Sequence, residues 1–296
     1  MDSYPATPTP PLAAALLCTY QQDRPEWLAE ALDSMLQQTY ASSAVRIYLG
    51  VDGPLPAALL EVINARRARI YKISSTEQRQ GLARCLNRLI GLLEDEVYVF
   101  RMDADDVCLP DRFARQVSYL ESHPEIAILG TAIQEMDAAG RALRVRTYPK
   151  AHSVRATIAK ASPLAHPTVC MRTEALRALG GYPIEGTNED IALWFNACRK
   201  GYRIDNLPAA LLRYRLTSAT YARRGAEKAW GELKVYVKGI WGLYGPTWRL
   251  VFPLLRYLLR LMPSQVTHLA YRSTGLRNWL TRTGRLAEGE SAGPKS

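Results

Sequence analysis

The sequence lacks paired cysteines, long apolar runs and a basic leader. Its five cysteines are scattered over 296 residues and none has CxxC spacing, which argues against a zinc site or a disulfide framework. No apolar run reaches the length of about 18 residues that a transmembrane helix needs. Residues 1–11 hold four prolines and no basic residue, so we expect a disordered N-terminus and no secretory signal.

The positive charge of the chain is concentrated near its C-terminus. Residues 221–285 contain twelve Lys or Arg and two Glu, so this segment alone accounts for the net charge of +10. Such a block predicts an anionic partner, either a membrane surface or a nucleic acid. The sequence contains no nucleic-acid motif and its presumed cleft is acidic, so we expect an anionic membrane surface and no nucleic acid.

Apolar periodicity predicts an α/β fold. Strand-like runs at residues 12–19, 45–51, 70–73 and 97–102 alternate with helical spacing at 26–38, 55–66, 82–93 and 111–122. This order predicts a Rossmann-like, mostly parallel sheet with helices on both faces. Ligands then sit outside the carboxyl ends of the strands.

Beyond residue 125 the pattern is less regular. We expect extended segments at 126–137 and 141–148, helices at 155–160, 173–179 and 189–200, and a strand at 211–216. The domain would therefore span residues 12–225, with halves at 12–125 and 126–225. A basic helical extension over residues 226–285 and a disordered tail over residues 286–296 would follow.

The densest acidic cluster lies at residues 103–106, directly after the buried strand 97–102. Asp103 and Asp105, two residues apart, can converge on one hard cation. Mg²⁺ and Mn²⁺ accept such carboxylates together with phosphate oxygens. The alternative is a solvated turn that caps the next helix.

Other polar residues occupy comparable places. Asp52 ends the strand 45–51, although strand-end Asp-Gly is also a common turn. Gly81 and Asn87 border the start of a helix, where a Gly-initiated helix with a buried Asn is the alternative. Glu189 and Asp190 open another helix, whose dipole alone would favour acids there, but an acid at this place also suits a general base. A lone histidine such as His166 is more often structural than catalytic.

The joint order of these motifs resembles family 2 glycosyltransferases, in particular the subgroup that includes amylovoran-type exopolysaccharide transferases. The resemblance covers roughly residues 12 to 226. In the first half it rests on Cys18-Thr19-Tyr20, Val51-Asp52-Gly53, Gly81 to Asn87, Arg101 to Asp106 and Leu109 to Phe113. In the second half it rests on His166 to Val169, Gly180-Gly181-Tyr182, Asn188-Glu189-Asp190, Leu193-Trp194, Lys200-Gly201-Tyr202, Arg213-Tyr214-Arg215 and Arg223-Arg224-Gly225.

This resemblance implies a GT-A fold, an inverting transfer and a role for each matching residue. Asp190 would be the general base, and Asp103 and Asp105 would bind Mn²⁺ or Mg²⁺. The donor nucleotide would contact Tyr20, Asp52, Gly81, Asn87, Arg101 and Asp103. The acceptor site would include His166, Glu189 and Trp194. Many members carry a histidine where this chain has Leu216 and Thr217, so Arg223 and Arg224 would bind the diphosphate instead.

The basic extension contains an amphipathic pattern. Arg249, Arg256 and Arg260 fall within about 40° of one another on a helix, and the remaining face is apolar. This predicts a helix in the membrane interface with its arginines at the headgroups. Packing of the helix on the catalytic domain is the alternative.

The sequence therefore predicts a cytoplasmic enzyme, peripheral on the inner face of the cytoplasmic membrane. It would transfer a hexose from a nucleotide-sugar, with uridine as the expected base, to a lipid-linked or saccharide acceptor in bacterial surface polysaccharide biosynthesis. One alternative is a sugar-phosphate nucleotidyltransferase, although residues 19–23 lack the glycine-rich loop of that class. The other is a non-catalytic membrane scaffold, which the intact acids disfavour.

Overall fold

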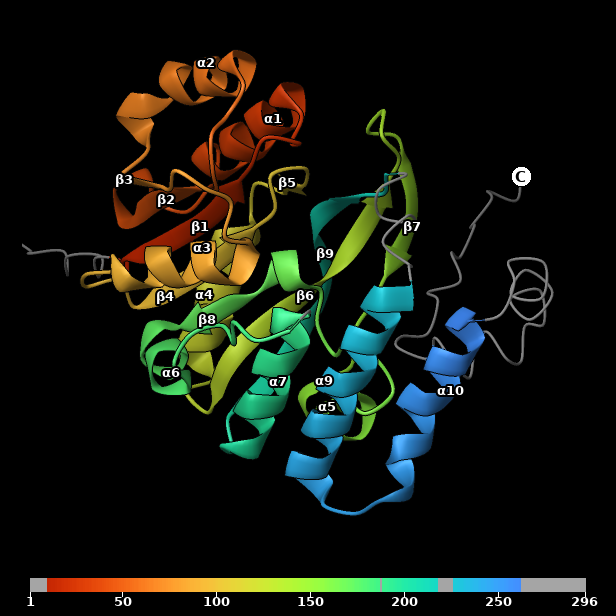
Figure 1. The fold of residues 1–296 in the computed structure, drawn as a ribbon. Coiled ribbons are helices and arrows are strands. Elements are labelled where there is room, and N and C mark those ends of the chain that lie inside the picture. Colours follow the sequence, from red (N-terminus) through yellow and green to blue (C-terminus); the bar gives the residue numbers. More distant parts are fainter. Residues whose placement is uncertain (1–9, 187, 218–225, 262–296) are drawn as a thin grey trace, which may run out of the picture.

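The computed structural model describes residues 10–186, 188–217 and 226–261, which form an α/β fold around one mixed sheet (Figure 1). Most of the predicted disordered N-terminus and the whole predicted tail lie outside these residues. No helix within the described ranges is long and apolar enough to cross a membrane.

The first half of the chain alternates strands and helices, as its periodicity predicts. It contains β1 (Ala13–Thr19), α1 (Pro25–Leu36), β2 (Val45–Val51), α2 (Ala57–Ala65), β3 (Lys72–Ser75), α3 (Leu82–Gly91), β4 (Tyr98–Met102), β5 (Val107–Cys108) and α4 (Arg112–Ser122). Strand β5 was not predicted, because two residues are too short to show a period.

The second half departs further from the prediction. It contains β6 (Ile126–Met136), β7 (Ala142–Arg146), α5 (Ala151–Thr157), β8 (Cys170–Arg172), α6 (Thr173–Leu179), α7 (Glu189–Arg199), β9 (Arg203–Arg215), α9 (Ala226–Tyr244) and α10 (Val251–Leu261). Helix α5 begins four residues before the predicted start, because the carboxylate of Asp205 accepts the backbone N–H of Ala151 at 2.8 Å. Strand β9 begins eight residues early, because tertiary pairing with β6 overrides its low strand propensity around Pro208.

The strands lie in the order β3-β2-β1-β4-β8-β6-β9-β5, with β7 beside β6. Strands β1 to β4 pair in parallel, as predicted. Strand β8 pairs antiparallel with β4 and β6, as β5 does with β9, whereas β6 and β9 are parallel. The carboxyl ends of β2, β1 and β4 therefore meet at one edge of the sheet.

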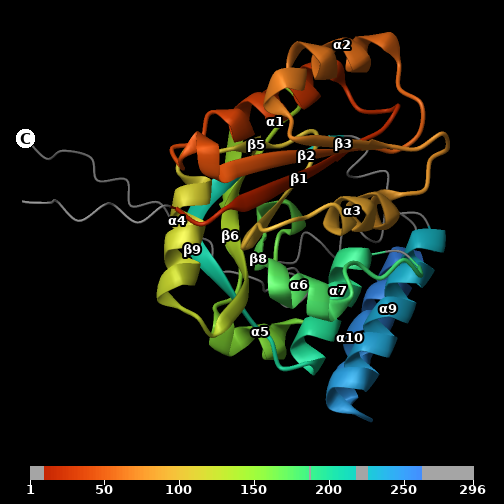
Figure 2. The same ribbon diagram turned by 90° about the vertical axis from the view of Figure 1, so that its left-hand side faces the viewer.

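Side chains of the parallel strands alternate between two cores. In β1, Ala14 and Leu16 belong to one buried cluster, whereas Ala13, Ala15 and Leu17 belong to the other, as the two-residue period of a strand requires. Helices α1, α2 and α4 cover the second cluster, and α3, α6 and α7 cover the first (Figure 2). Burial on both faces explains why the strand sequences are apolar throughout.

Helices α9 and α10 form a hairpin that packs on the α/β domain through α9 and α7 (Figure 1). The contact is close at Gly239, where an added Cβ would lie 2.3 Å from the ring of Phe195. Tyr236 and Ile240 are buried beside it. The helix expected to carry the arginines is α10, and it also contacts the domain, where Arg256 donates to the backbone carbonyl of Lys160, as the packing alternative predicts.

The predicted orientation of the arginine stripe is wrong. Arg256 donates to Glu232 of α9 at 2.7 Å and lies 4.5 Å from the ring centroid of Tyr236. Arg260 pairs with the same carboxylate, and Arg249 stacks on Tyr244. Because a partly buried Glu232 attracts compensating positive charge, Arg256 and Arg260 face α9. Phe252 is buried, whereas Val251, Leu254 and Leu258 face outward.

Candidate active site

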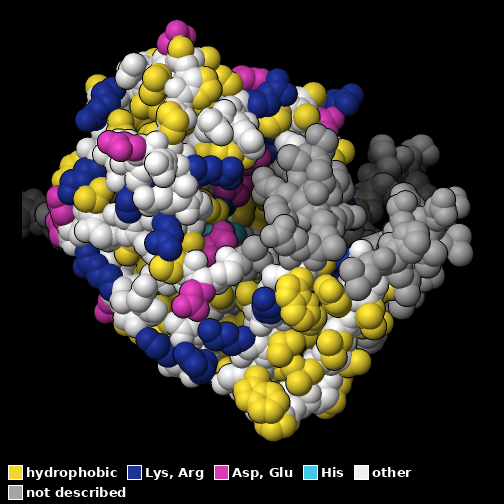
Figure 3. Space-filling view, viewed as in Figure 1, with side chains coloured by type: hydrophobic (Ala, Val, Ile, Leu, Met, Phe, Trp, Pro, Cys, Tyr) yellow, Lys and Arg dark blue, Asp and Glu magenta, His cyan; other side chains and the backbone are white. Residues whose placement is uncertain are grey.

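Three strand ends place predicted site residues at the same edge of the sheet. Tyr20 follows β1, Asp52 follows β2 and Asp103 follows β4. Since β1 lies between β2 and β4, these residues meet where parallel sheets bind ligands. Acidic side chains border a hollow in the face shown in Figure 3.

Asp52, one of the residues predicted to contact the nucleotide, anchors the loop that precedes α3. Its carboxylate oxygens accept the backbone N–H groups of Gln80 and Gly81, both at 2.8 Å. Gly81 has a φ of +92°, a conformation that favours glycine. The Arg79 guanidinium lies 4.3 Å from the ring centroid of Tyr20. Asp52 therefore positions the loop that carries Arg79, a residue that the motifs did not identify.

Asn87 has a structural partner in the second half of the chain. Its side-chain amide donates to the carbonyl of Tyr182 at 2.7 Å, and its Oδ1 accepts the Tyr182 N–H at 2.8 Å. Gly181, at a φ of +73°, permits this approach, since a Cβ there would lie 2.5 Å from the Asn87 oxygen. The predicted contact of Asn87 with the donor nucleotide would therefore be indirect, through the turn at residues 180–182.

The predicted metal-binding acids converge and include one more carboxylate. Asp103, Asp105 and Asp106 each offer an oxygen, and these oxygens all lie within 4.8 Å of one another. Asp106 is buried, and its Oδ2 has no hydrogen-bond partner among the described residues. Oxygen ligands, crowded negative charge and this unpartnered oxygen fit Mn²⁺ or Mg²⁺.

The proton affinity of the cluster reflects this crowding. Burial and the neighbouring carboxylates of Asp103 and Asp23 raise the pKa of Asp105 to about 6. Burial, Asp103 and Asp105 raise the pKa of Asp106 well above its usual value. A cation at this place would relieve the repulsion between these acids.

Arg215, at the end of β9, holds the acidic loop in place through hydrogen bonds. Its backbone N–H donates to Asp106 Oδ1 at 2.9 Å and its Nε donates to the carbonyl of Asp105 at 2.8 Å. Its guanidinium also pairs with Glu30 of α1. From the sequence, Arg215 has no role beyond its place in the motif Arg213-Tyr214-Arg215, because no local pattern shows that β9 ends beside the acids.

Arg101 lies beneath the cluster, only 3% exposed, and pairs with Asp103. Burial opposes its charge, but Asp103 raises its pKa overall. Its Nε and Nη1 atoms have no hydrogen-bond partner among the described residues. Leaving a buried N–H group without a hydrogen bond is costly, so these two N–H groups are suited to donate to oxygen atoms of a ligand.

The predicted base begins α7. Asp190 is half-buried beside Glu189, and the preceding Asn188 has a φ of 63°, a strained conformation that asparagine tolerates better than most residues. Burial and Glu189 raise the pKa of Asp190 to about 6, against the opposing effects of the Ile191 N–H and Arg101. A carboxylate with this pKa is suited to accept a proton near neutral pH.

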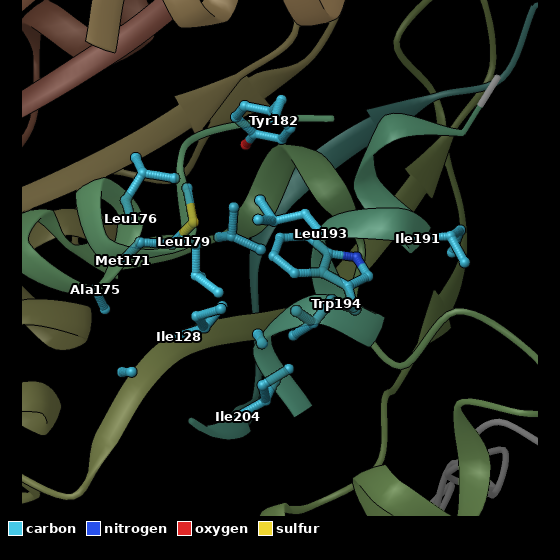
Figure 4. Packing of buried hydrophobic residues seen from close by; sticks show 14 of the residues in the cluster. Ile128, Met171, Ala175, Leu176, Leu179, Tyr182, Ile191, Leu193, Trp194 and Ile204 are labelled. Atoms are coloured by element: carbon cyan, nitrogen blue, oxygen red, sulfur yellow. The ribbon is translucent and has the colours of Figure 1, made fainter. Parts of the chain in front are cut away.

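His166 and Trp194, which the resemblance assigns to the acceptor site, lie beside each other. The Nε2 atom of His166 lies 2.9 Å from the Tyr182 hydroxyl, and burial followed by Arg101 lowers the pKa of His166 well below its usual value. Trp194 has no exposed surface and belongs to the buried cluster shown in Figure 4. Its ring lies edge-on against the ring of His166. A role of Trp194 in shaping the acceptor site would therefore be indirect, through its contact with His166. Arg223 and Arg224 lie outside the described residues.

The profile described as Glycosyltransferase like family 2 matches residues 10–237 of the chain. The chain belongs to this family. This glycosyltransferase is 32% identical over 262 residues to the amylovoran biosynthesis glycosyltransferase AmsE of Erwinia amylovora, covering 87% of this chain and 97% of that protein. It is 30% identical over 227 residues to the Escherichia coli UDP-Gal:alpha-D-GlcNAc-diphosphoundecaprenol beta-1,3-galactosyltransferase, covering 76% and 82%.

Solved structures establish the fold of this glycosyltransferase. The mannosyltransferase PcManGT of Pyrobaculum calidifontis, in complex with GDP-Man and Mn²⁺, has a TM-score of 0.63 at 16% identity and covers 93% of this chain and 84% of its own. TarS 1–349 of S. aureus with UDP-GlcNAc has a TM-score of 0.62 at 15% identity, covering 90% and 77%. The glycosyltransferase therefore has the GT-A fold, as the motifs predict. Neither the nucleotidyltransferase nor the scaffold alternative has support among these proteins.

Proposed function

We propose that this glycosyltransferase transfers a hexose from a UDP-sugar, with inversion, to a lipid-linked or saccharide acceptor in bacterial exopolysaccharide biosynthesis. The observation that carries the proposal is the convergence of Asp103, Asp105 and Asp106 at a sheet edge that also holds Tyr20 and Asp52. The names of the relatives support the pathway.

The acidic cluster and nearby arginines would hold the diphosphate of the donor. Asp103 and Asp105 would bind Mn²⁺ or Mg²⁺, and Asp106 adds a carboxylate beside them. The bound cation would stabilise the negative charge of the departing diphosphate. Arg223 and Arg224 remain proposed diphosphate contacts.

The loop before α3 would receive the nucleotide. Tyr20, Asp52 and Gly81 border this place, and Arg101 is available below Asp103. We propose uridine as the base because the Escherichia coli relative is named for UDP-Gal and TarS is described with UDP-GlcNAc.

Asp190 would accept the proton of the attacking acceptor hydroxyl. Glu189 lies beside it and raises its proton affinity. His166, neutral at pH 7, can exchange a hydrogen bond with the acceptor or with Tyr182. Direct attack assisted by a base needs no covalent intermediate with the protein, and it inverts the anomeric centre.

A lipid-linked acceptor would place the transfer reaction at a membrane. The Escherichia coli relative is named for a diphosphoundecaprenol-linked substrate, which is a lipid. We propose that this chain also works at the inner face of the cytoplasmic membrane, and that residues 240–285 bind the anionic membrane surface there.

Inversion is tested by the configuration of the first product. Proton NMR of UDP-galactose, UDP-glucose and UDP-GlcNAc incubated with enzyme and Mn²⁺ follows the released sugar before it mutarotates. We expect β-configured sugar from these α-linked donors, because water would attack from the face opposite the diphosphate. An α-configured first product would contradict an inverting transfer.

A further inference from the structure

The outer side of α10 is apolar and uncovered by the described residues. Val251, Leu254 and Leu258 are 47%, 47% and 54% exposed. Their spacing of three and four residues puts them on one side of the helix. Arg256 and Arg260 each follow an exposed leucine by two residues, about 200° around the helix, and they bind Glu232.

Tryptophans and lysines extend this surface. Trp248, just before α10, is 67% exposed, and Trp241 of α9 is 56% exposed. Lys234 and Lys238 are exposed on the same stripe of α9 as Trp241, since all three lie at helical spacing. Hydrophobic side chains visibly gather over the two helices (Figure 3). We call Trp241, Trp248, Val251, Leu254 and Leu258 the hairpin face.

We propose that the hairpin face inserts into the interfacial layer of a lipid bilayer while the arginines of α10 stay turned toward the domain. This inference rests on the proposed function, because a lipid-linked acceptor is what would bring the enzyme to a membrane. It differs from attachment by the arginine stripe, because the anchoring free energy would come mainly from buried apolar area.

The composition of the surface favours lipid. A contiguous exposed apolar patch marks an interaction site, and tryptophan prefers the boundary between apolar and aqueous layers. The neighbouring Lys234 and Lys238 match the negative headgroups of an anionic leaflet. Insertion along an amphipathic helix that lacks a membrane-spanning length is the interfacial mode of binding.

Other occupants match the charge less well. A second copy would bring its own Lys234 and Lys238 toward these lysines. Residues 262–285 contain four arginines and no acidic residue, so this segment offers no negative charge to the lysines either. A lipid leaflet supplies both apolar depth and negative charge.

The test is flotation of the full chain with vesicles of phosphatidylethanolamine and phosphatidylglycerol, at low and high NaCl. The variant is Leu254→Glu with Leu258→Glu. The control is Leu60→Glu with Leu143→Glu, whose parent side chains are 45% and 54% exposed elsewhere on the domain. We expect wild type and control to bind, with substantial binding retained at high salt. The hairpin variant should bind at least about tenfold more weakly, because charge replaces buried apolar area.

Equal vesicle binding by the hairpin variant, or no binding by the wild type, would overturn the proposal. A wild-type dimer in light scattering that the hairpin variant converts to a monomer would assign the face to a second copy instead. Mn²⁺-dependent UDP affinity, measured on the same samples, separates this proposal from the catalytic one. The hairpin variant should retain that affinity. If the wild type itself showed no Mn²⁺-dependent UDP affinity, the proposed function would fail, whatever the result of vesicle binding.

Discussion

Asp105→Ala is expected to abolish Mn²⁺-dependent UDP binding and to lower donor turnover by at least about 10³-fold. Metal stabilisation of the leaving charge contributes several kcal/mol to such reactions, which corresponds to a factor of this order. The fold should persist. Because the pKa of Asp105 is raised in the folded protein to about 6, its charged form costs stability once the pH exceeds the unfolded pKa. Its removal should therefore leave the melting temperature at pH 7.5 unchanged or higher.

Calorimetric titration of UDP with and without Mn²⁺ measures this effect. The matched control is Asp111→Ala, which removes a half-exposed carboxylate that pairs with Arg115. The control should bind UDP as the wild type does. If folded Asp105→Ala keeps the metal-dependent affinity, the cation site lies elsewhere.

Asp190→Asn should slow transfer by about 10²-fold or more, with donor affinity nearly unchanged. The substitution keeps the shape of the side chain but removes its basicity, and proton transfer by a positioned group is typically worth this much. Glu189→Gln is the companion variant, because it changes the neighbouring acid in the same way. A larger loss in Glu189→Gln than in Asp190→Asn, under conditions where chemistry limits the rate, would move the base to Glu189.

The pH profile gives the same assignment a second readout. A base must be unprotonated, and burial beside Glu189 raises the pKa of Asp190 to about 6. In the wild type, kcat/KM should therefore fall as the pH drops below about 6, approaching tenfold per pH unit. The residual activity of Asp190→Asn should lose this dependence. An unchanged acidic limb in the variant would assign the titration to another group.

The strand ends of the site could be predicted because they depend on local pattern. Continuous apolar runs indicate buried parallel strands, and a polar residue directly after such a run lies at the sheet edge that binds ligands. This reasoning identifies Asp52, Asp103 and Asp105, and the resemblance adds Asp190.

The remaining contacts join segments that are distant in sequence. Arg215 meets Asp105 and Asp106 across 110 and 109 positions, and Asn87 meets Tyr182 across 95 positions. Neither contact has a local signal. Tertiary pairing also extends β9 through residues with low strand propensity.

The hairpin of α9 and α10 shows a second limit of prediction from sequence. Helical periodicity identifies the stripe shared by Arg249, Arg256 and Arg260 but not the direction in which that stripe points. The position of Glu232 on the neighbouring helix decides the direction, and the membrane proposal changes from a charge-dominated to an apolar contact.

Metal-dependent transfer from a UDP-sugar is tested most directly by nucleotide release from a panel of UDP- and GDP-sugars, followed with Mn²⁺ and with EDTA. We expect at least one UDP-sugar to be hydrolysed or transferred in Mn²⁺, and EDTA to reduce the rate to that of Asp105→Ala. Equal release in Mn²⁺ and EDTA, or release from GDP-sugars alone, would rule out this chemistry.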